Sequence, residues 1–217
     1  MIGALLFDLD GTFADTAPDL GNALNRQLAR RGLAPLPLAT IRPHASAGAR
    51  GLLALGFGLA PGAPEYDAMR EEFLSLYEQA LCEDTRLFAG IEPLLAALDA
   101  RGVPWGIVTN KPARFTLPLL VALRIAGRTP CIVSGDTCPQ AKPHPAPLLH
   151  GAALLGTTPA QCAYVGDDER DMLASRAAGM FAVIARYGYL GGRPHVEWDA
   201  DAAIASPGEL LTLLAAP

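Results

Sequence analysis

The sequence lacks the cysteine pairs that would mark a zinc site or a disulfide framework. Its four cysteines, Cys82, Cys131, Cys138 and Cys162, are scattered, and none forms a C-x-x-C pair. Isolated cysteines of this kind are typical of a protein kept in a reducing compartment. We therefore expect free thiols and a cytoplasmic location.

Long hydrophobic runs are missing too. No apolar run approaches the ~18 residues that a membrane-spanning helix needs. The opening MIGALLFDLDG has no basic start and soon reaches Asp8, so we expect no signal peptide. Positive charge is scarce, because 17 Lys and Arg face 22 Asp and Glu for a net charge of −5. The bulk charge thus gives no reason to expect a nucleic-acid partner, and the hydropathy none to expect a membrane.

What is present is a globular composition, with 51% hydrophobic and 18% charged residues in 217. The fully apolar run at 4–7 predicts a strand that is buried on both faces. Similar runs predict strands at 103–108, 131–133, 162–165, 181–185 and 202–205. Amphipathic segments between or after these runs predict helices at 91–101, 145–155, 171–178 and 210–214. This alternation favours an α/β fold with a Rossmann-like, doubly wound parallel sheet.

The gap after the first strand is too long for a simple crossover. Roughly 90 residues separate it from the second strand, and they contain helix-like segments near 17–32, 40–55 and 65–82. Pro43 predicts a bend within the second segment, and the Gly- and Pro-rich stretch 56–64 predicts a loop. We expect a helical cap domain at 15–85, hinged near 12–18 and 84–90, on a core of 1–14 and 86–217.

Polar side chains follow the predicted strands where each strand ends. They lie in Asp8-Leu9-Asp10-Gly11-Thr12, in Thr109-Asn110-Lys111, around Lys142 in AKPHP, and in GDDERD at 166–171. Each piece alone has a common structural explanation, such as a turn or a helix N-cap. In open α/β sheets, however, ligands bind beyond the carboxyl ends of the strands. The four pieces together therefore predict one site.

The residue types at this site favour phosphoryl transfer. Clustered carboxylates repel one another unless a cation joins them, and oxygen ligands suit Mg²⁺. Asp8 can attack phosphorus, while Asp10 can protonate the leaving oxygen and later activate water. Thr109 can hydrogen-bond the phosphoryl oxygens, and Lys142 can offset the negative charge gathered there.

With these motifs the chain resembles phosphatases of the haloacid dehalogenase superfamily over nearly its full length. The matching segments are DLDGT (8–12), VTNKP (108–112), AKPHP (141–145) and GDDERD (166–171). The resemblance implies a cap inserted after the first strand, Asp8 as nucleophile and Asp10 as acid/base. It puts phosphate binding on Thr109, Asn110 and Lys142. It puts Mg²⁺ on Asp8, the Asp10 carbonyl and Asp167, with Asp171 ligating directly or supporting the site.

Two substrate groups remain open at this point. DGTFADTAPD (10–19) is similar to the opening of the phosphoglycolate phosphatase group. SAGAR (46–50), WGIVTNKPARF (105–115), GDDERDM (166–172) and RYGY (186–189) are similar to segments of N-acetylmuramic acid 6-phosphate phosphatases. In either case the partner is a small phosphorylated metabolite.

The cap has to select the substrate, since the core contacts only the phosphate. Candidate contacts to its organic part are Arg42, His44, Ser46, Arg50 and Lys111. Asp168 stands where a small hydroxyl residue is common in the resembled family, so its role is open. Both a monomer and a homodimer fit the sequence.

Other functions fit less well. A haloalkanoic-acid dehalogenase needs no second acid two residues after the nucleophile, so Asp10 argues against it. A sugar phosphomutase shares the first motif and is separated only by its product. A non-catalytic binding module predicts a lost nucleophile, whereas Asp8 is present.

Overall fold

The core is a six-stranded parallel sheet. The computed structural model describes residues 2–191 and 194–215. Its strands, in the spatial order β5-β4-β1-β6-β7-β8, are Ile132–Val133, Trp105–Val108, Ala4–Phe7, Cys162–Gly166, Phe181–Ala185 and Ala202–Ile204. Every pairing in this sheet is parallel. The predicted doubly wound α/β fold is confirmed.

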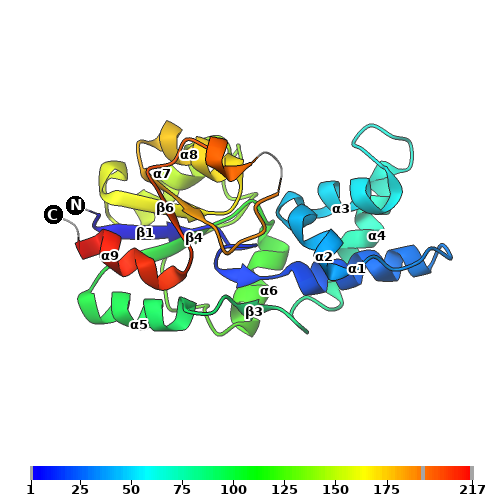
Figure 1. Ribbon diagram of the computed structural model, residues 1–217, viewed down its shortest axis with the longest axis horizontal. Helices are drawn as coiled ribbons and strands as arrows, with labels where there is room; N and C mark the ends of the chain where they lie inside the picture. Colours follow the sequence, from blue (N-terminus) through cyan, green and yellow to red (C-terminus); the bar gives the residue numbers. More distant parts are fainter. Residues whose placement is uncertain (1, 192–193, 216–217) are drawn as a thin grey trace.

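Helices cover both faces of the sheet (Figure 1). One layer contains α5 (Ile91–Arg101), α6 (Ala113–Ala122) and α9 (Leu210–Ala215), and the other contains α7 (Ala146–Leu154) and α8 (Glu169–Ala178). Leu5 and Phe7 pack in the first layer and Leu6 in the second, because alternate side chains of a strand point to opposite faces. Helix α6 was not among the predicted helices; Pro118 interrupts its pattern.

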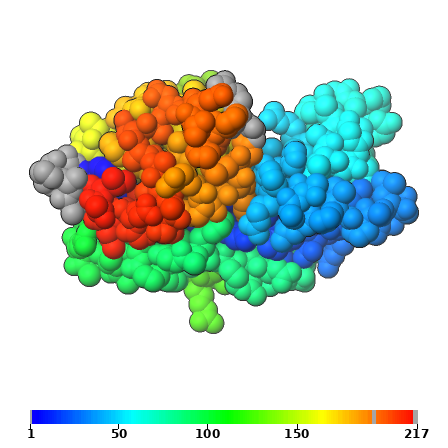
Figure 2. Space-filling model, in the orientation of Figure 1, coloured from blue at the N-terminus to red at the C-terminus, as the bar shows by residue number. Residues whose placement is uncertain are grey.

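Residues between β1 and α5 form a separate helical lobe, for which we use the name cap (Figures 1 and 2). It contains α1 (Ala17–Ala29), α2 (Leu38–Ile41), α3 (Gly48–Phe57) and α4 (Tyr66–Glu78) around its own buried cluster. The second predicted helical segment, near 40–55, is interrupted at the place where Pro43 predicts a bend. A 3-10 helix at Arg42–Ala47 separates α2 from α3, because Pro43 cannot donate a backbone hydrogen bond and Gly48 turns the chain at φ +58°.

Two short strands connect this lobe to the core. β2 (Ala14–Asp15) and β3 (Arg86–Leu87) pair antiparallel where the sequence predicts the hinges. The buried carboxylate of Asp19, in the first turn of α1, accepts hydrogen bonds from the Thr85 amide and hydroxyl at 2.8 and 2.7 Å. The two hinge segments are therefore fixed side by side. The boundaries of the cap at 15 and 85 stay a prediction.

All four cysteines are free thiols, as the sequence predicts, and Cys131 and Cys162 are buried. Among the described residues, no helix has both the length and the apolar character that crossing a membrane requires.

Candidate active site

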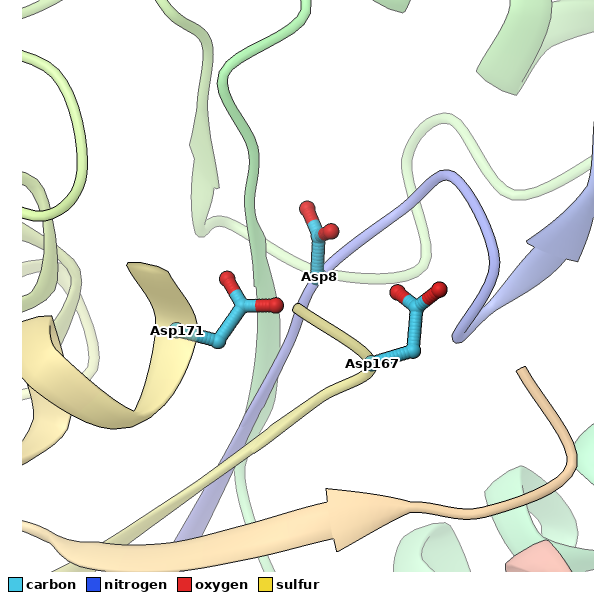
Figure 3. Close-up of side chains that lie close together, drawn as sticks. All are labelled: Asp8, Asp167 and Asp171. Atoms are coloured by element: carbon cyan, nitrogen blue, oxygen red, sulfur yellow. The ribbon is translucent and has the colours of Figure 1, made fainter. Parts of the chain in front are cut away.

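Three buried carboxylates meet at the carboxyl end of the sheet. Asp8 follows β1, Asp167 follows β6, and Asp171 lies in the first turn of α8. One carboxylate oxygen from each lies within 4.8 Å of the others, and Figure 3 shows the three side chains around a common space. Parallel strands end at the same edge, so residues far apart in sequence converge here, as predicted.

The electrostatics of this cluster fit a bound divalent cation. Burial raises the pKa of Asp167 well above its ordinary range, and the neighbouring Asp8 and Asp171 add to this effect. Burial likewise raises the pKa of Asp171 to about 7, although Lys142 opposes the rise. The Lys142 ammonium pairs with two of the three acids, Asp8 and Asp171, and all the ligand atoms of the cluster are oxygens. This donor set suits a hard ion of the Mg²⁺ class.

Lys142 supplies the positive charge at the bottom of the site. Its ammonium, on a side chain only 3% exposed, lies 2.9 Å from Asp8 Oδ1 and 2.7 Å from Asp171 Oδ1. It also donates to the Tyr164 hydroxyl at 2.6 Å and to the Val108 carbonyl at 3.2 Å. These contacts hold the Lys142 ammonium beside the Asp8 carboxylate.

Asn110 holds the Lys142 segment in place. Its side-chain oxygen accepts from the Lys142 amide and its side-chain nitrogen donates to the Lys142 carbonyl, both at 2.9 Å. The Asn110 side chain, expected to bind phosphate, is therefore already engaged with the backbone of Lys142. Among the described residues, the buried Thr109 hydroxyl has one hydrogen-bond partner, the Lys111 amide, from which it accepts at 3.1 Å, so its proton is available to a ligand.

Asp10 lies beside the cluster and contacts two donors. Its Oδ1 accepts from the Thr16 hydroxyl at 2.5 Å and from Lys111 Nζ at 3.0 Å. The Lys111 ammonium also lies over the Tyr77 ring of α4, 4.6 Å from its centroid. Lys111, expected at the substrate, therefore bridges Asp10 and the cap.

Asp167 is surrounded by donors from the core and the cap. Thr12 Oγ1 donates to one of its oxygens at 3.0 Å, while Ser46 Oγ of the cap and the Tyr189 amide donate to the other at 3.0 and 2.9 Å. Gly11, at φ +87°, lies so close that a Cβ there would be 2.2 Å from Asp167 Oδ2. Only glycine fits this turn.

A cavity of about 270 Å³ opens above these residues, between core and cap. The predicted residues that line it are Asp8, Asp10, Ser46, Arg50, Thr109, Asn110, Lys111, Lys142 and Asp171. The prediction missed Arg70 of α4 and Arg170 of α8, together with an apolar wall of Leu20, Tyr66, Phe73, Leu74 and Phe115. Helical spacing along α4 could have shown that Tyr66, Arg70, Phe73 and Tyr77 share a face.

Two expected cap contacts are absent from this cavity. Over the described residues, its lining includes neither Arg42 nor His44. Arg42 instead forms a two-pronged ion pair with Asp15 of the hinge, at 2.8 and 2.9 Å. His44 is exposed on the 3-10 helix. The segment that bends at Pro43 first lines the cavity at Ala45.

Asp168, whose role the sequence left open, caps helix α8. Its Oδ1 accepts from the Arg170 amide at 2.9 Å, and the Asp171 carboxylate accepts from the Asp168 amide in return. Its carboxylate also pairs with the Arg170 side chain at 2.7 Å. Arg170 in turn donates to the Ser46 carbonyl at 2.9 Å and so connects core and cap.

Comparisons with known proteins agree with this geometry. The family model described as haloacid dehalogenase-like hydrolase matches residues 5–185. A phosphoglycolate phosphatase from Xanthomonas campestris pv. campestris is 45% identical over 95% of this chain and 94% of its own. An N-acetylmuramic acid 6-phosphate phosphatase from Pseudomonas aeruginosa is 39% identical over 97% of this chain and 94% of its own.

Solved structures agree as well. The crystal structure of a predicted phosphoglycolate phosphatase from Haemophilus somnus superposes with a TM-score of 0.84 at 27% identity, covering 98% of both chains. The match spans the sheet, both helix layers and the helical lobe. On the family model and these relatives, the chain belongs to the haloacid dehalogenase-like hydrolases.

Proposed function

We propose that the chain is a Mg²⁺-dependent phosphatase that hydrolyses a small phosphate monoester through a phosphorylated Asp8. The observation that carries the proposal is the setting of Asp8. It lies in a buried carboxylate cluster at the base of the cavity, with the Lys142 ammonium 2.9 Å away. Relatives at 45% and 39% identity are named as phosphatases.

The proposed reaction has two steps. An Asp8 oxygen attacks phosphorus, the bond from phosphorus to the ester oxygen breaks, and Asp10 gives a proton to that oxygen. Water then attacks the phosphorus of phospho-Asp8, Asp10 takes its proton, and phosphate leaves with the Asp8 carboxylate restored. Lys142 stabilises the charge on the phosphoryl oxygens, and Thr109 donates a hydrogen bond to them.

Bound Mg²⁺ would neutralise the carboxylate cluster and a phosphoryl oxygen. Asp8 and Asp167 would hold it with side-chain oxygens and Asp10 with its backbone carbonyl. Asp171 supports this site, either as a ligand or through Lys142, which it contacts at 2.7 Å.

The favoured substrate is 2-phosphoglycolate or a similar small ester. The cavity volume of about 270 Å³ lies just below the usual range for ligand pockets, which begins at about 300 Å³. Arg50 and Arg70 of the cap line the cavity, and neither has a partner among residues 2–191 and 194–215. Two free guanidiniums suit a substrate that carries a carboxylate besides its phosphate.

The alternative substrate is N-acetylmuramic acid 6-phosphate. The apolar wall of Tyr66, Phe73, Leu74 and Phe115 supports it, because a bare glycolate has no apolar surface to cover that wall. So does the relative of that name, which matches nearly its full length.

A side-by-side assay of the two esters tests both the phosphatase activity and the choice of substrate. The Mg²⁺-loaded protein should release inorganic phosphate from one of the two esters much faster than from the other, and EDTA should stop the release. Asp8→Asn should abolish it while the protein stays folded. Full turnover in that variant would refute the nucleophile, and an isomerised sugar phosphate without free phosphate would indicate a mutase.

A cytoplasmic location and a monomeric or homodimeric state stay predictions. Size-exclusion chromatography with light scattering measures the second directly.

A further inference from the structure

Tyr189, the last residue of the RYGY segment, lies outside the four strand-end motifs of the proposed chemistry, yet it joins several parts of the site. It follows β7 and is only 5% exposed. Its amide donates to Asp167 Oδ2 at 2.9 Å, while its hydroxyl reaches the start of the cap. The neighbouring Gly188 is pressed against Asp167, since a Cβ there would be 2.3 Å from the Asp167 Cβ. The backbone of this loop is therefore fixed to the carboxylate cluster.

The Tyr189 hydroxyl binds the N-terminus of α1, the first helix of the cap, from the core side of the hinge. It accepts hydrogen bonds from the amides of Thr16 and Ala17 at 2.7 and 2.8 Å, and it donates its proton to Asp15 Oδ1 at 3.0 Å. Thr16 is the N-cap residue of α1, yet its side chain makes no capping bond. Tyr189 thus satisfies two amides at the N-terminus of α1, Thr16 and Ala17, for which the helix itself offers no acceptor.

The Thr16 hydroxyl, which makes no capping bond of its own, has a different partner. The hydroxyl donates to Asp10 Oδ1 at 2.5 Å. On the other side, Asp15 binds Arg42 of the cap, whose guanidinium lies 5.6 Å from the centroid of the Tyr189 ring. Tyr189 therefore connects Asp167, the hinge and Arg42. Through Thr16, which it binds, it is also linked to Asp10.

We propose that Tyr189 is a positioning residue that fixes the cap hinge relative to the carboxylate cluster and thereby orients Asp10. The orientation of Asp10 matters only if Asp10 is the acid/base of the proposed function, so this part rests on that proposal. The attachment of the hinge to Tyr189 does not depend on it. The two parts are tested separately.

The test compares Tyr189→Phe with Tyr187→Phe. The first variant keeps the ring and the backbone amide but loses the hydroxyl that holds the hinge. The second is a matched control on the same loop, because the buried Tyr187 hydroxyl has no hydrogen-bond partner among the described residues. Hydrogen exchange of the Thr16 and Ala17 amides should accelerate at least about tenfold in Tyr189→Phe alone. Unchanged exchange would overturn the proposal, whatever the activity.

The kinetic readout uses leaving groups that differ in their need for a proton. An alkyl phosphate needs the acid to leave, whereas p-nitrophenolate leaves without one. For Tyr189→Phe we expect kcat/KM to fall about tenfold for the preferred alkyl ester and distinctly less for p-nitrophenyl phosphate. Equal losses for both would contradict a role through Asp10. An inactive wild type would refute the proposed function and leave the exchange result standing.

A double-mutant cycle gives an independent check. Arg42→Met disrupts the same connection from the cap side, so its effect on amide exchange should be non-additive with that of Tyr189→Phe. Additive effects would show that Arg42 and Tyr189 act separately, and would overturn the proposed connection between hinge and cap.

Discussion

Replacing Lys142 with methionine should destabilise the metal-free protein strongly. The substitution keeps most of the unbranched side chain but removes the ammonium that contacts Asp8 at 2.9 Å and Asp171 at 2.7 Å. Removing one partner of a buried pair leaves the other charges uncompensated, at a cost of about 3–5 kcal/mol. A chain of this size loses about 2–4 °C of melting temperature per kcal/mol, so we expect a fall of about 6–20 °C.

The loss should depend on pH in a defined direction. The pKa of Asp171 is already raised to about 7, chiefly by burial, and Lys142 is the main group that lowers it. Without Lys142 the folded-state pKa of Asp171 rises further above its unfolded value. The folded variant then binds more protons than the unfolded chain, so its stability falls as pH rises through this window. Protonation of Asp171 at lower pH removes much of the penalty.

The assay is thermal unfolding followed by circular dichroism, after EDTA treatment, at about pH 5.5 and about pH 8. The melting temperature of Lys142→Met should fall distinctly further below that of the wild type at the higher pH. Arg101→Met is the control, since Arg101 is exposed at the end of α5 and its loss should cost at most about 0.5 kcal/mol. An equal loss at both pH values, or none, would refute the assignment of Lys142 as the neutralising charge.

Three further changes test other parts of the structure. Gly11→Ala should raise the Mg²⁺ concentration needed for half-maximal activity at least about tenfold, because the new Cβ would be 2.2 Å from Asp167 Oδ2. An unchanged Mg²⁺ titration would contradict this close approach. Glu72→Gln should cost less than about 1 kcal/mol at neutral pH, since the partly exposed pair with Arg31 is screened by solvent. The pKa of Glu72 is lowered from 4.5 to about 2, chiefly by Arg31. The stabilisation by this ion pair is therefore fully present above pH 4.5 and disappears as the pH falls towards 2. Urea unfolding at several pH values measures this loss. Arg70→Met should raise KM for carboxylated esters about tenfold and leave p-nitrophenyl phosphate nearly unaffected; equal effects on both would remove Arg70 from substrate selection.

The sequence predicted much of the core site because the relevant signals are local. Short apolar runs mark strands that are buried on both faces, and the polar residues that follow each run must lie at one edge of a parallel sheet. Asp8, Thr109, Lys142 and Asp167 could therefore be grouped before any coordinates were known. The insertion between the first two strands was equally visible, because its length exceeds that of a crossover.

The cap side depended on tertiary contacts that have no local signal. Arg42 and Arg70 are both cationic residues of cap segments, yet the bend at Pro43 directs the first to Asp15 while the face of α4 presents the second to the cavity. Periodicity cannot show which face of a helix meets the core, since that choice is made by packing across the hinge.

The sequence by itself determined the parallel sheet, the inserted helices and the identity of the acidic cluster, since strand burial and strand-end position are encoded within a few residues. The tertiary structure alone decided that Asn110 holds Lys142, that Ser46 reaches Asp167, and that Tyr189 caps a helix about 170 residues before it. Such contacts join segments distant in sequence. Their geometry exists only once the core has folded and the helical lobe has packed against it.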